Sequence, residues 1–208
     1  MRRDLKRRAI LDAALAEFLE HGYLGAGMDR VAARAGASKV TVYAHFADKH
    51  ALFEAVLADA IDGAERAGSV FVDALAETDD LPRDLRAFAR EHIASVLRPH
   101  LVQLRRMLIG EAGRFPELAR AWHRAAPERG HATLAAVVTR LAERGLLRAP
   151  DPLLAAQHLN YLVLSIPLNE TMFAVRAEYD DAELHRWADE AVRVFLAAYG
   201  APGAALPA

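Results

Sequence analysis

The chain has 208 residues, of which 53% are hydrophobic, and its formal net charge is −2. This length allows a small domain followed by a larger one with an extensive core. The sequence contains no cysteine, which excludes disulfides and any metal site or nucleophile based on cysteine. It shows neither an apolar N-terminal leader nor an apolar run of the roughly 18 residues that a membrane-spanning helix needs, so we expect a cytoplasmic protein without a membrane partner.

The chain begins with an alanine-rich stretch whose apolar residues recur at helical spacing. We predict a helix over residues 4–20, with Ile10, Ala14 and Phe18 on its inner face. Gly22 follows this stretch, and a glycine at such a position is typical of a helix end. The first helix is therefore expected to provide the core of a small domain.

Two short helical patterns separated by a glycine turn follow over residues 28–49. The first pattern is apolar at the spacing of one buried helix face, at Met28, Val31, Ala32 and Ala35. Gly36 can take the left-handed conformation that ends a helix, and Ser38 can cap the helix that comes next. The pattern thus predicts two helices joined by a tight turn.

The two faces of the second short helix differ in character. Val42 and Phe46 lie four residues apart on one face, which we assign to the core. The other face carries Val40, Tyr43 and Ala44. A face that is small, aromatic and hydrogen-bonding, with a lysine just before and just after the helix, suits a DNA groove better than water. A helix, a tight turn and an exposed second helix form the helix-turn-helix arrangement.

Residues 10–57 resemble the N-terminal DNA-binding domain of the TetR/AcrR family of transcriptional regulators. The positions that agree together are Phe18, Gly22, Val31-Ala32, Ala35-Gly36, Ser38-Lys39, Thr41, Tyr43, His45-Phe46, Lys49 and Leu52. The resemblance covers about a quarter of the chain. The chain departs from the family pattern at Ala26 and Gly27, where many members carry Thr or Ser before the second helix. A hydroxyl group that could cap this helix or contact a phosphate is therefore missing.

Charge is distributed unevenly along the chain. Residues 1–50 carry nine Lys or Arg and six Asp or Glu, a net charge of +3, whereas the remainder carries a net charge of −5. Such a split fits a domain that meets DNA phosphates attached to one that does not. A basic stretch at the N-terminus is either a solvated helix start or an arm that contacts the DNA backbone; it comprises Arg2, Arg3, Lys6, Arg7 and Arg8.

The resemblance places seven residues at DNA-contact positions: Lys39, Val40, Thr41, Tyr43, Ala44, His45 and Lys49. The two lysines bracket the recognition helix, and Lys49 also stands at a helix N-terminus, which favours a phosphate. Tyr43 and His45 can donate to phosphate oxygens, Val40 and Ala44 can touch thymine methyl groups, and Thr41 can serve either a base or a phosphate. The alternative for Tyr43 is that its ring packs on the first helix.

Beyond the helix-turn-helix every pattern is helical, so we predict an all-α fold with about nine helices. The expected later helices cover residues 49–76, 83–98, 99–112, 116–144, 151–173 and 181–199, with residues 201–208 as a frayed end. Pro127 should bend or break the helix 116–144, because proline cannot donate a backbone hydrogen bond. The predicted domains are a helix-turn-helix DNA-binding domain at 1–50 and a helical regulatory domain for ligand binding and dimerisation at 51–208.

The resemblance implies a homodimer that binds a palindromic operator and releases it when a small-molecule effector binds the regulatory domain. The last two helices, 151–173 and 181–199, are apolar enough to form a four-helix interface with a second chain, and the same faces would equally serve as an intramolecular core. Residues that add polar tips or adaptable bulk to the regulatory domain are candidates for either the effector site or ordinary core: His92, Met107, Glu111, Phe115, Trp122, His123, Tyr161 and Met172.

The leading prediction is a ligand-responsive transcriptional regulator that acts as a repressor and needs no cofactor. The alternative is a helical protein that binds or sequesters a small molecule and whose vestigial DNA-binding domain binds DNA weakly or not at all, as the missing hydroxyl at Ala26-Gly27 suggests. A third hypothesis is a metal-responsive regulator, but no two histidines of the regulatory domain stand at i, i+4 on one helix with a carboxylate partner, as a compact zinc motif requires. The sequence shows no Gly-rich phosphate loop and no Gly-x-Ser-x-Gly motif, which argues against an enzyme.

Overall fold

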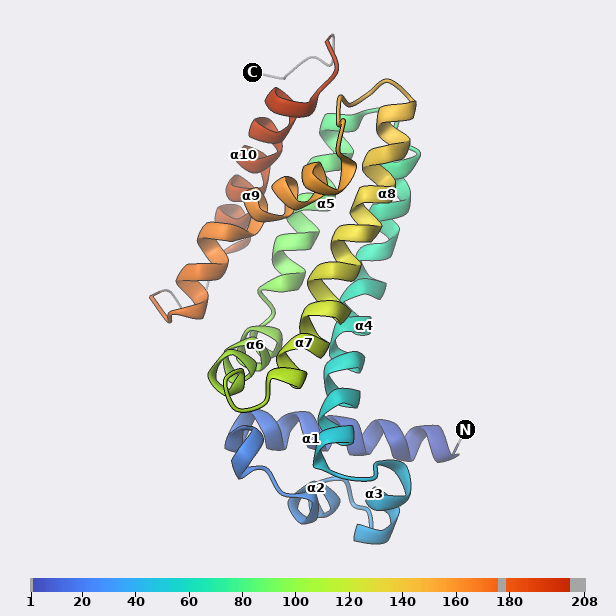
Figure 1. Cartoon of the computed structure of the whole chain (residues 1–208), viewed down its shortest axis with the longest axis vertical. Coiled ribbons are helices and arrows are strands. Elements are labelled where there is room, and N and C mark those ends of the chain that lie inside the picture. Colours follow the sequence, from blue (N-terminus) through green and yellow to red (C-terminus); the bar gives the residue numbers. More distant parts are fainter. Residues whose placement is uncertain (1, 176–178, 203–208) are drawn as a thin grey trace. The chain divides into compact units, whose positions relative to one another are not determined.

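The computed structural model describes residues 2–175 and 179–202, including the side chains of all of these except residues 2 and 64–69. Residues 203–208 of the predicted frayed end lie outside the described residues. Ten α-helices occur in the described part of the chain, which confirms the predicted all-α class (Figure 1). The described residues form two compact units: the first is drawn from 1–63 and 99–125, and the second from 64–98 and 126–208.

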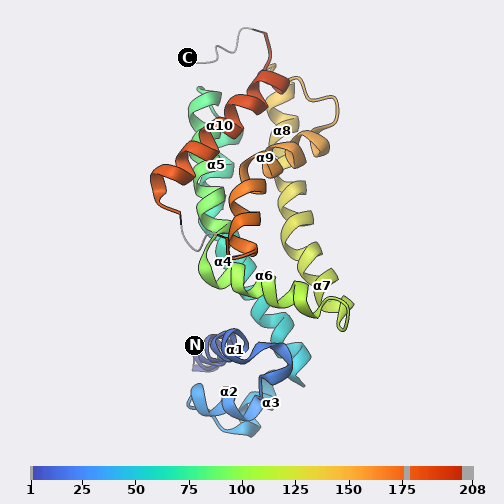
Figure 2. The same ribbon diagram turned by 90° about the vertical axis from the view of Figure 1, so that its left-hand side faces the viewer.

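The first unit contains the two predicted short helices packed on the long first helix. Its elements are α1 (Arg2–Gly25), α2 (Met28–Arg34), α3 (Lys39–His45), the first part of α4 (Lys49–Ala76), α6 (Pro99–Glu111) and α7 (Pro116–His123). In Figures 1 and 2, α2 and α3 lie on one side of α1, and α6 lies on the other. The backbone of Gly22 has a φ of 70°, so α1 breaks at the predicted glycine and makes one further turn to Gly25.

An aromatic cluster forms part of the core of the first unit. The ring of Phe18 packs edge-on against that of Phe53 at the start of α4, with 4.8 Å between centroids. Tyr23 lies 5.0 Å from Phe53, and Phe115, just before α7, packs edge-on against Tyr23 at 4.8 Å. Such edge-to-face pairs add to the stabilisation that burial of the rings provides. The cluster therefore ties α1 to the beginnings of α4 and α7.

A buried carboxylate on α1 holds the start of α2, where Ala26 and Gly27 offer no hydroxyl. Gly27 is the N-cap of α2 and has no side chain to cap the helix. Its backbone N–H donates instead to Oε1 of Glu17 at 3.2 Å, and Nε of Arg30 donates to the same oxygen at 2.5 Å. Arg30 also donates to the carbonyl of Gly25. The Glu17 side chain, only 1% exposed, thus fixes the start of α2 against α1.

The second unit is built on packed helices that bury a common apolar core. Its elements are the remainder of α4, α5 (Leu81–Val96), α8 (Arg129–Glu143), α9 (Pro152–Met172) and α10 (Asp181–Tyr199). α8 packs along α9, and α10 packs along both α5 and α9 (Figure 2). Three of these helices begin with an aspartate whose side chain accepts a backbone N–H of the first turn, namely Asp80, Asp151 and Asp180.

The predicted helix 116–144 is broken at the proline. It consists of α7, a short π-helix at Arg124–Glu128 that contains Pro127, and α8. Proline lacks the backbone N–H that would continue the regular ladder, so the wider turn accommodates it. This break raises the number of helices in the described residues from the predicted nine or so to ten. The other predicted helices from residue 49 onward agree with the observed bounds to within two residues.

The compact units do not follow the predicted boundary at residue 50, because residues 99–125 group with the N-terminal helices. The assignment of DNA binding to residues 1–50 and of regulation to 51–208 concerns function and stays a prediction. None of the described helices combines the length and the apolar character needed to cross a membrane.

Replacing Glu17 by glutamine should lower the free energy of unfolding by about 1–2 kcal/mol at pH 7, because the buried acceptor loses the negative charge that strengthens its hydrogen bonds from Arg30 and the Gly27 N–H. The matched control is Glu20→Gln, which breaks an exposed ion pair with Arg34 and should change stability by less than about 0.5 kcal/mol. Chemical denaturation followed by circular dichroism measures both. Equal effects of the two substitutions would contradict the role given to Glu17.

The loss at Glu17 should also depend on pH. Burial alone would raise the pKa of Glu17, but the hydrogen bonds from Arg30 and the Gly27 N–H outweigh it and hold the pKa below its ordinary value of 4.5. A depressed folded-state pKa stabilises the protein above the unfolded pKa, and this contribution disappears as pH falls through the folded pKa. The stability difference between wild type and Glu17→Gln should therefore be full above about pH 5.5 and shrink progressively below pH 4.5.

Candidate DNA-binding site

The helix α3 begins and is positioned as the sequence predicts. Gly36 has a φ of 55°, the left-handed conformation that ends α2 and turns the chain. Ser38 is the N-cap of α3, and its side chain accepts the backbone N–H of Thr41 at 3.1 Å. The Nζ of Lys6 on α1 donates to the carbonyl of Gly36 at 2.9 Å. The turn between the two short helices is thus held from both sides.

The two faces of α3 differ in exposure in the predicted way. Val42 is 0% exposed and Phe46 is 6% exposed, so both belong to the core. Val40 is 77% exposed, Tyr43 is 44% exposed, and Ala44 beside them is also exposed. Tyr43 is thus exposed over nearly half of its surface, and the alternative that its ring packs on the first helix stays open. The outward face of α3 offers a methyl-bearing, small and aromatic surface of the kind that enters a major groove.

Both predicted lysines already hold partners within the protein. The Nζ of Lys39 lies 2.8 Å from Oδ1 of Asp29 on α2, and this hydrogen-bonded contact raises the pKa of Lys39. The Nζ of Lys49 donates to the carbonyls of Leu24 and Ala26 at 3.1 and 3.2 Å. The same Nζ lies 5.0 Å from the centroid of the Tyr23 ring, and a phosphate contact by Lys49 stays a prediction. Thr41 and His45 are both half-buried, at the edge of the exposed face.

The basic N-terminal stretch forms the first turns of α1. Besides the bond from Lys6, the guanidinium of Arg7 lies 5.5 Å from the centroid of the Phe46 ring. Arg8 pairs with Asp59 of α4 at 2.9 Å. These three residues thus contact other parts of the same unit, a structural use that the two predicted roles of the stretch did not include. The side chain of Arg2 lies outside the described residues.

The eight predicted effector-site residues do not gather in one unit. Met107, Glu111, Phe115, Trp122 and His123 lie in the first unit, and His92, Tyr161 and Met172 lie in the second. Trp122 is buried with the guanidinium of Arg105 at 5.8 Å from its ring centroid, whereas Tyr161 is exposed on α9. His92 is half-buried, stacks on Phe88 and forms a 2.9 Å hydrogen bond with Asn160 of α9. The role of all eight in effector binding stays a prediction.

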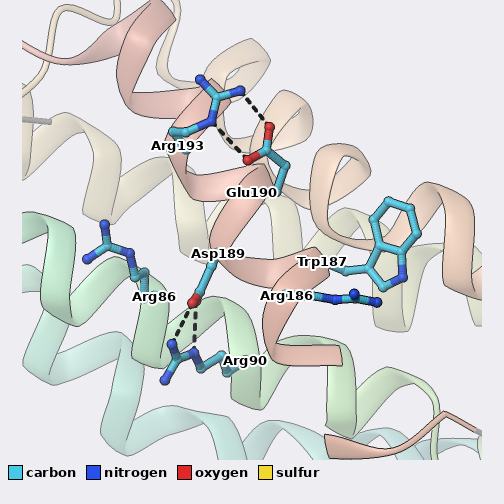
Figure 3. Close-up of a pocket in the computed structure, with 7 residues that line it drawn as sticks. All are labelled: Arg86, Arg90, Arg186, Trp187, Asp189, Glu190 and Arg193. Carbon is cyan, nitrogen blue, oxygen red and sulfur yellow. Dashed lines mark hydrogen bonds and ion pairs between the residues drawn. The ribbon is translucent and has the colours of Figure 1, made fainter. Parts of the chain in front are cut away.

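Sequence reasoning missed a pocket lined by α5 and α10 (Figure 3). Its lining residues are Arg86, Arg90, Arg186, Trp187, Asp189, Glu190 and Arg193. Arg90 donates to both carboxylate oxygens of Asp189, at 2.8 and 2.6 Å, and Arg193 similarly engages Glu190. The Arg90–Asp189 pair joins α5 to α10 in a bidentate geometry. The pocket is an open, charged surface where ion pairs form between and along α5 and α10.

No group of three or more His, Cys, Asp or Glu side chains suited to a metal ion occurs among the residues that the structure describes.

Comparison with known proteins relates both parts of the chain to one family. Residues 10–56 match the family model described as bacterial regulatory proteins of the tetR family. Residues 83–201 match the model described as the C-terminal domain of AefR-like transcriptional repressors. Together these matches include the helix-turn-helix and most of the remaining chain.

Solved structures agree over nearly the whole chain. A TetR-family transcriptional regulator of Mesorhizobium loti is 40% identical, with a TM-score of 0.90 over 96% of this chain and 99% of that one. The flavonoid-responsive regulator FrrA is 27% identical, with a TM-score of 0.76 over 95% and 98%. SmeT, the repressor of the Stenotrophomonas maltophilia multidrug efflux pump SmeDEF, is 29% identical, with a TM-score of 0.64 over 97% and 93%.

Curated relatives match through a short segment. The transcriptional activator FasR of Mycolicibacterium smegmatis is 47% identical over 60 residues, and the transcriptional repressor SCO4008 of Streptomyces coelicolor is 50% identical over 48. These segments span 29% and 23% of this chain and about a quarter of the length of the two relatives, 27% and 25%. With both family models matched and a whole-chain likeness at 40% identity, the chain belongs to the TetR family of transcriptional regulators, a non-enzymatic family that binds DNA through its helix-turn-helix.

Proposed function

We propose that the protein is a cytoplasmic, homodimeric repressor that binds a palindromic operator through α3 and leaves it when a small-molecule effector binds the C-terminal domain. The observation that carries the proposal is the orientation of α3. Its buried side, Val42 and Phe46, fixes the helix, and its exposed side presents Val40, Tyr43 and Ala44 to solvent. A regulator uses such a face to read base edges in the major groove.

Repression is favoured over activation by the relatives that match the C-terminal domain. The family model that covers residues 83–201 is described as that of a transcriptional repressor, and SmeT, which aligns along nearly all of this chain, is a repressor. FasR is an activator, but its match covers only 60 residues. The sign of regulation is more plausibly shared with relatives that match beyond the DNA-binding segment.

A small organic effector is supported by one relative and by one polar contact. FrrA, similar along 95% of this chain, is named as flavonoid-responsive. In the second unit, His92 and Asn160 form a half-buried hydrogen-bonded pair between α5 and α9. Effector sites are mainly apolar with a few placed polar groups. This pair is accordingly our first choice for the polar anchor of an effector, and of the two residues only His92 was singled out from the sequence.

Dimerisation is supported by apolar side chains left exposed along α9. They are Leu153, Leu154, Tyr161, Leu162 and Ile166, and Phe173 follows the helix end. On α10, the large apolar side chain exposed among the described residues is Val194. Several exposed large apolar side chains on one helix support an interface between subunits. The interface proposed for the last two helices would thus be centred on α9.

The alternative of a sequestering protein that lacks DNA binding depended on the missing hydroxyl at Ala26-Gly27. Glu17 accepts the backbone N–H of Gly27 and holds the start of α2 against α1 without that hydroxyl. The departure from the family pattern therefore gives no reason to regard the domain as vestigial.

Binding to DNA is tested by titrating the protein into a duplex taken from just upstream of its own gene and, separately, into a random duplex of the same length. We expect specific binding to the upstream duplex that survives an excess of the random one. A failure to bind either duplex at low salt would contradict the proposal and favour the sequestering alternative.

Substitutions on α3 and at the start of α4 should separate contacts that position the protein from contacts that read sequence. Val40→Ala should weaken binding to the operator by about 1 kcal/mol at particular base pairs and leave binding to random DNA unchanged. Lys49→Ala should weaken binding to both duplexes alike and reduce the salt slope by about one for each recognition helix engaged. Fluorescence anisotropy over a salt series measures both. The division of roles would be wrong if the two variants affected both duplexes equally.

Introducing a charge on α9 should separate the subunits. Ile166→Asp is expected to convert the dimer to monomers, because an unpaired charge would have to be buried at the interface. The matched control is Ile109→Asp, which changes a similarly exposed isoleucine on α6 and should leave the dimer intact. Sedimentation velocity gives the oligomeric state. Dimers that persist in Ile166→Asp, or dissociate equally in both variants, would argue against the α9 interface.

A further inference from the structure

Cations on α2 and α3 are held by carboxylates of the same unit. Arg30 pairs with Glu17, Arg34 pairs with Glu20, and Lys39 pairs with Asp29. The first of these carboxylates is buried and also accepts the backbone N–H of Gly27, whereas the other two are exposed. Arg30, Arg34 and Lys39 are thus each paired with a carboxylate of the protein itself, although residues 1–50 carry a net positive charge.

The Lys39–Asp29 pair stands closest to the surface proposed to meet DNA. Lys39 is the first residue of α3 and directly precedes the exposed Val40. Its Nζ lies 2.8 Å from Oδ1 and 3.1 Å from Oδ2 of Asp29, so both carboxylate oxygens face the ammonium group. The two side chains are 59% and 71% exposed, which leaves the pair accessible to a DNA phosphate. An exposed pair of this kind adds little to folding stability, so its significance lies elsewhere.

We propose that Asp29 acts as a built-in counter-ion for Lys39 and thereby limits the strength and the salt dependence of DNA binding. The inference rests on the proposed function, since it concerns how this helix-turn-helix meets phosphates. A lysine that neutralises a phosphate displaces cations condensed on the DNA, and this release makes binding salt-dependent. A lysine that brings its own carboxylate delivers almost no net charge to the phosphate. The Lys39–Asp29 pair therefore displaces few condensed cations from the DNA and adds little to sequence-independent affinity.

Such a counter-ion leaves the affinity to depend more on base contacts by α3. Electrostatic attraction to phosphates accounts for nearly all sequence-independent binding. A recognition helix with a neutralised first residue binds all DNA less tightly, while Val40, Thr41 and Ala44 remain available to read the operator. The effect requires no conformational change, because the two charged groups already touch in the free protein.

The test compares Asp29→Asn with wild type on a random duplex and on the upstream duplex, over salt from 50 to 300 mM. We expect the salt slope to steepen by about 0.9 for each recognition helix engaged, so the gain in affinity per helix should be about fivefold larger at 50 mM than at 300 mM. Both duplexes should show the change alike. The thermal midpoint should move little, because the pair is exposed.

Two further variants make the test specific. Glu20→Gln removes the same formal charge from the same unit by freeing Arg34 instead of Lys39, and it should give less than half of the change in slope. Asp29→Asn in a Lys39→Gln background should have almost no effect, since the cation that it frees is absent. An effect that persists in that background, or equal effects of Asp29→Asn and Glu20→Gln, would overturn the inference.

Three other outcomes would overturn the inference, and one of them would overturn the proposed function as well. Weaker DNA binding by Asp29→Asn would mean that Asp29 positions Lys39 productively, and this would overturn the inference while leaving the proposed function intact. An unchanged slope in Asp29→Asn would do the same. Absence of binding to either duplex by the wild-type protein at 50 mM salt would overturn the proposed function and the inference together.

Discussion

The DNA-binding region depends on the burial of two side chains beneath a helix of seven residues. A helix as short as α3 is not stable alone, because isolated helices below about 12 residues are marginal in water. Its position therefore comes from the packing of Val42 and Phe46, together with the Ser38 cap. Because these residues fix the inward side, the side chains on the opposite face have to point to solvent. The exposed face is thus a consequence of the core beneath it.

The same pairing of a cation with a carboxylate has different consequences at two depths in this unit. Glu17 is almost fully buried and accepts hydrogen bonds from Arg30 and the Gly27 backbone, so its removal should be felt as lost stability. Asp29 is exposed, and water already solvates its charge. Its removal should therefore change the affinity for DNA and leave the stability of the fold nearly unchanged. The net charge of a domain is therefore an incomplete guide to its attraction for DNA.

Features governed by local rules could be predicted from the sequence. The cap at Ser38, the opposed faces of α3 and the break at Pro127 each follow from a few neighbouring residues, and the structure confirms all three. Interactions between distant residues could not be predicted. The partners in the Arg90–Asp189 pair are 99 positions apart, and nothing in either segment points to the other.

In the candidate sites too, local features could be predicted and contacts between distant residues could not. The exposure of the α3 face follows from helical spacing, but the pairing of Lys39 with Asp29 depends on how α2 and α3 pack. The effector-site residues were chosen by side-chain chemistry alone, and chemistry does not say which helices come together. Five of them accordingly lie in one compact unit and three in the other. The polar partner of His92 is an asparagine that no local pattern distinguishes.

The most direct measurement of the central claim is to map which part of the protein lies against DNA. The chain has no cysteine, so a single introduced cysteine can carry an iron chelate that cleaves nearby DNA. One label is placed at Ala47→Cys, an exposed position just after α3, and the other at Gln103→Cys, an exposed position on α6. We predict localised cleavage of the upstream duplex by the label at 47 and none by the label at 103. Cleavage from 103 alone, or equally from both positions, would contradict the claim that α3 enters the groove.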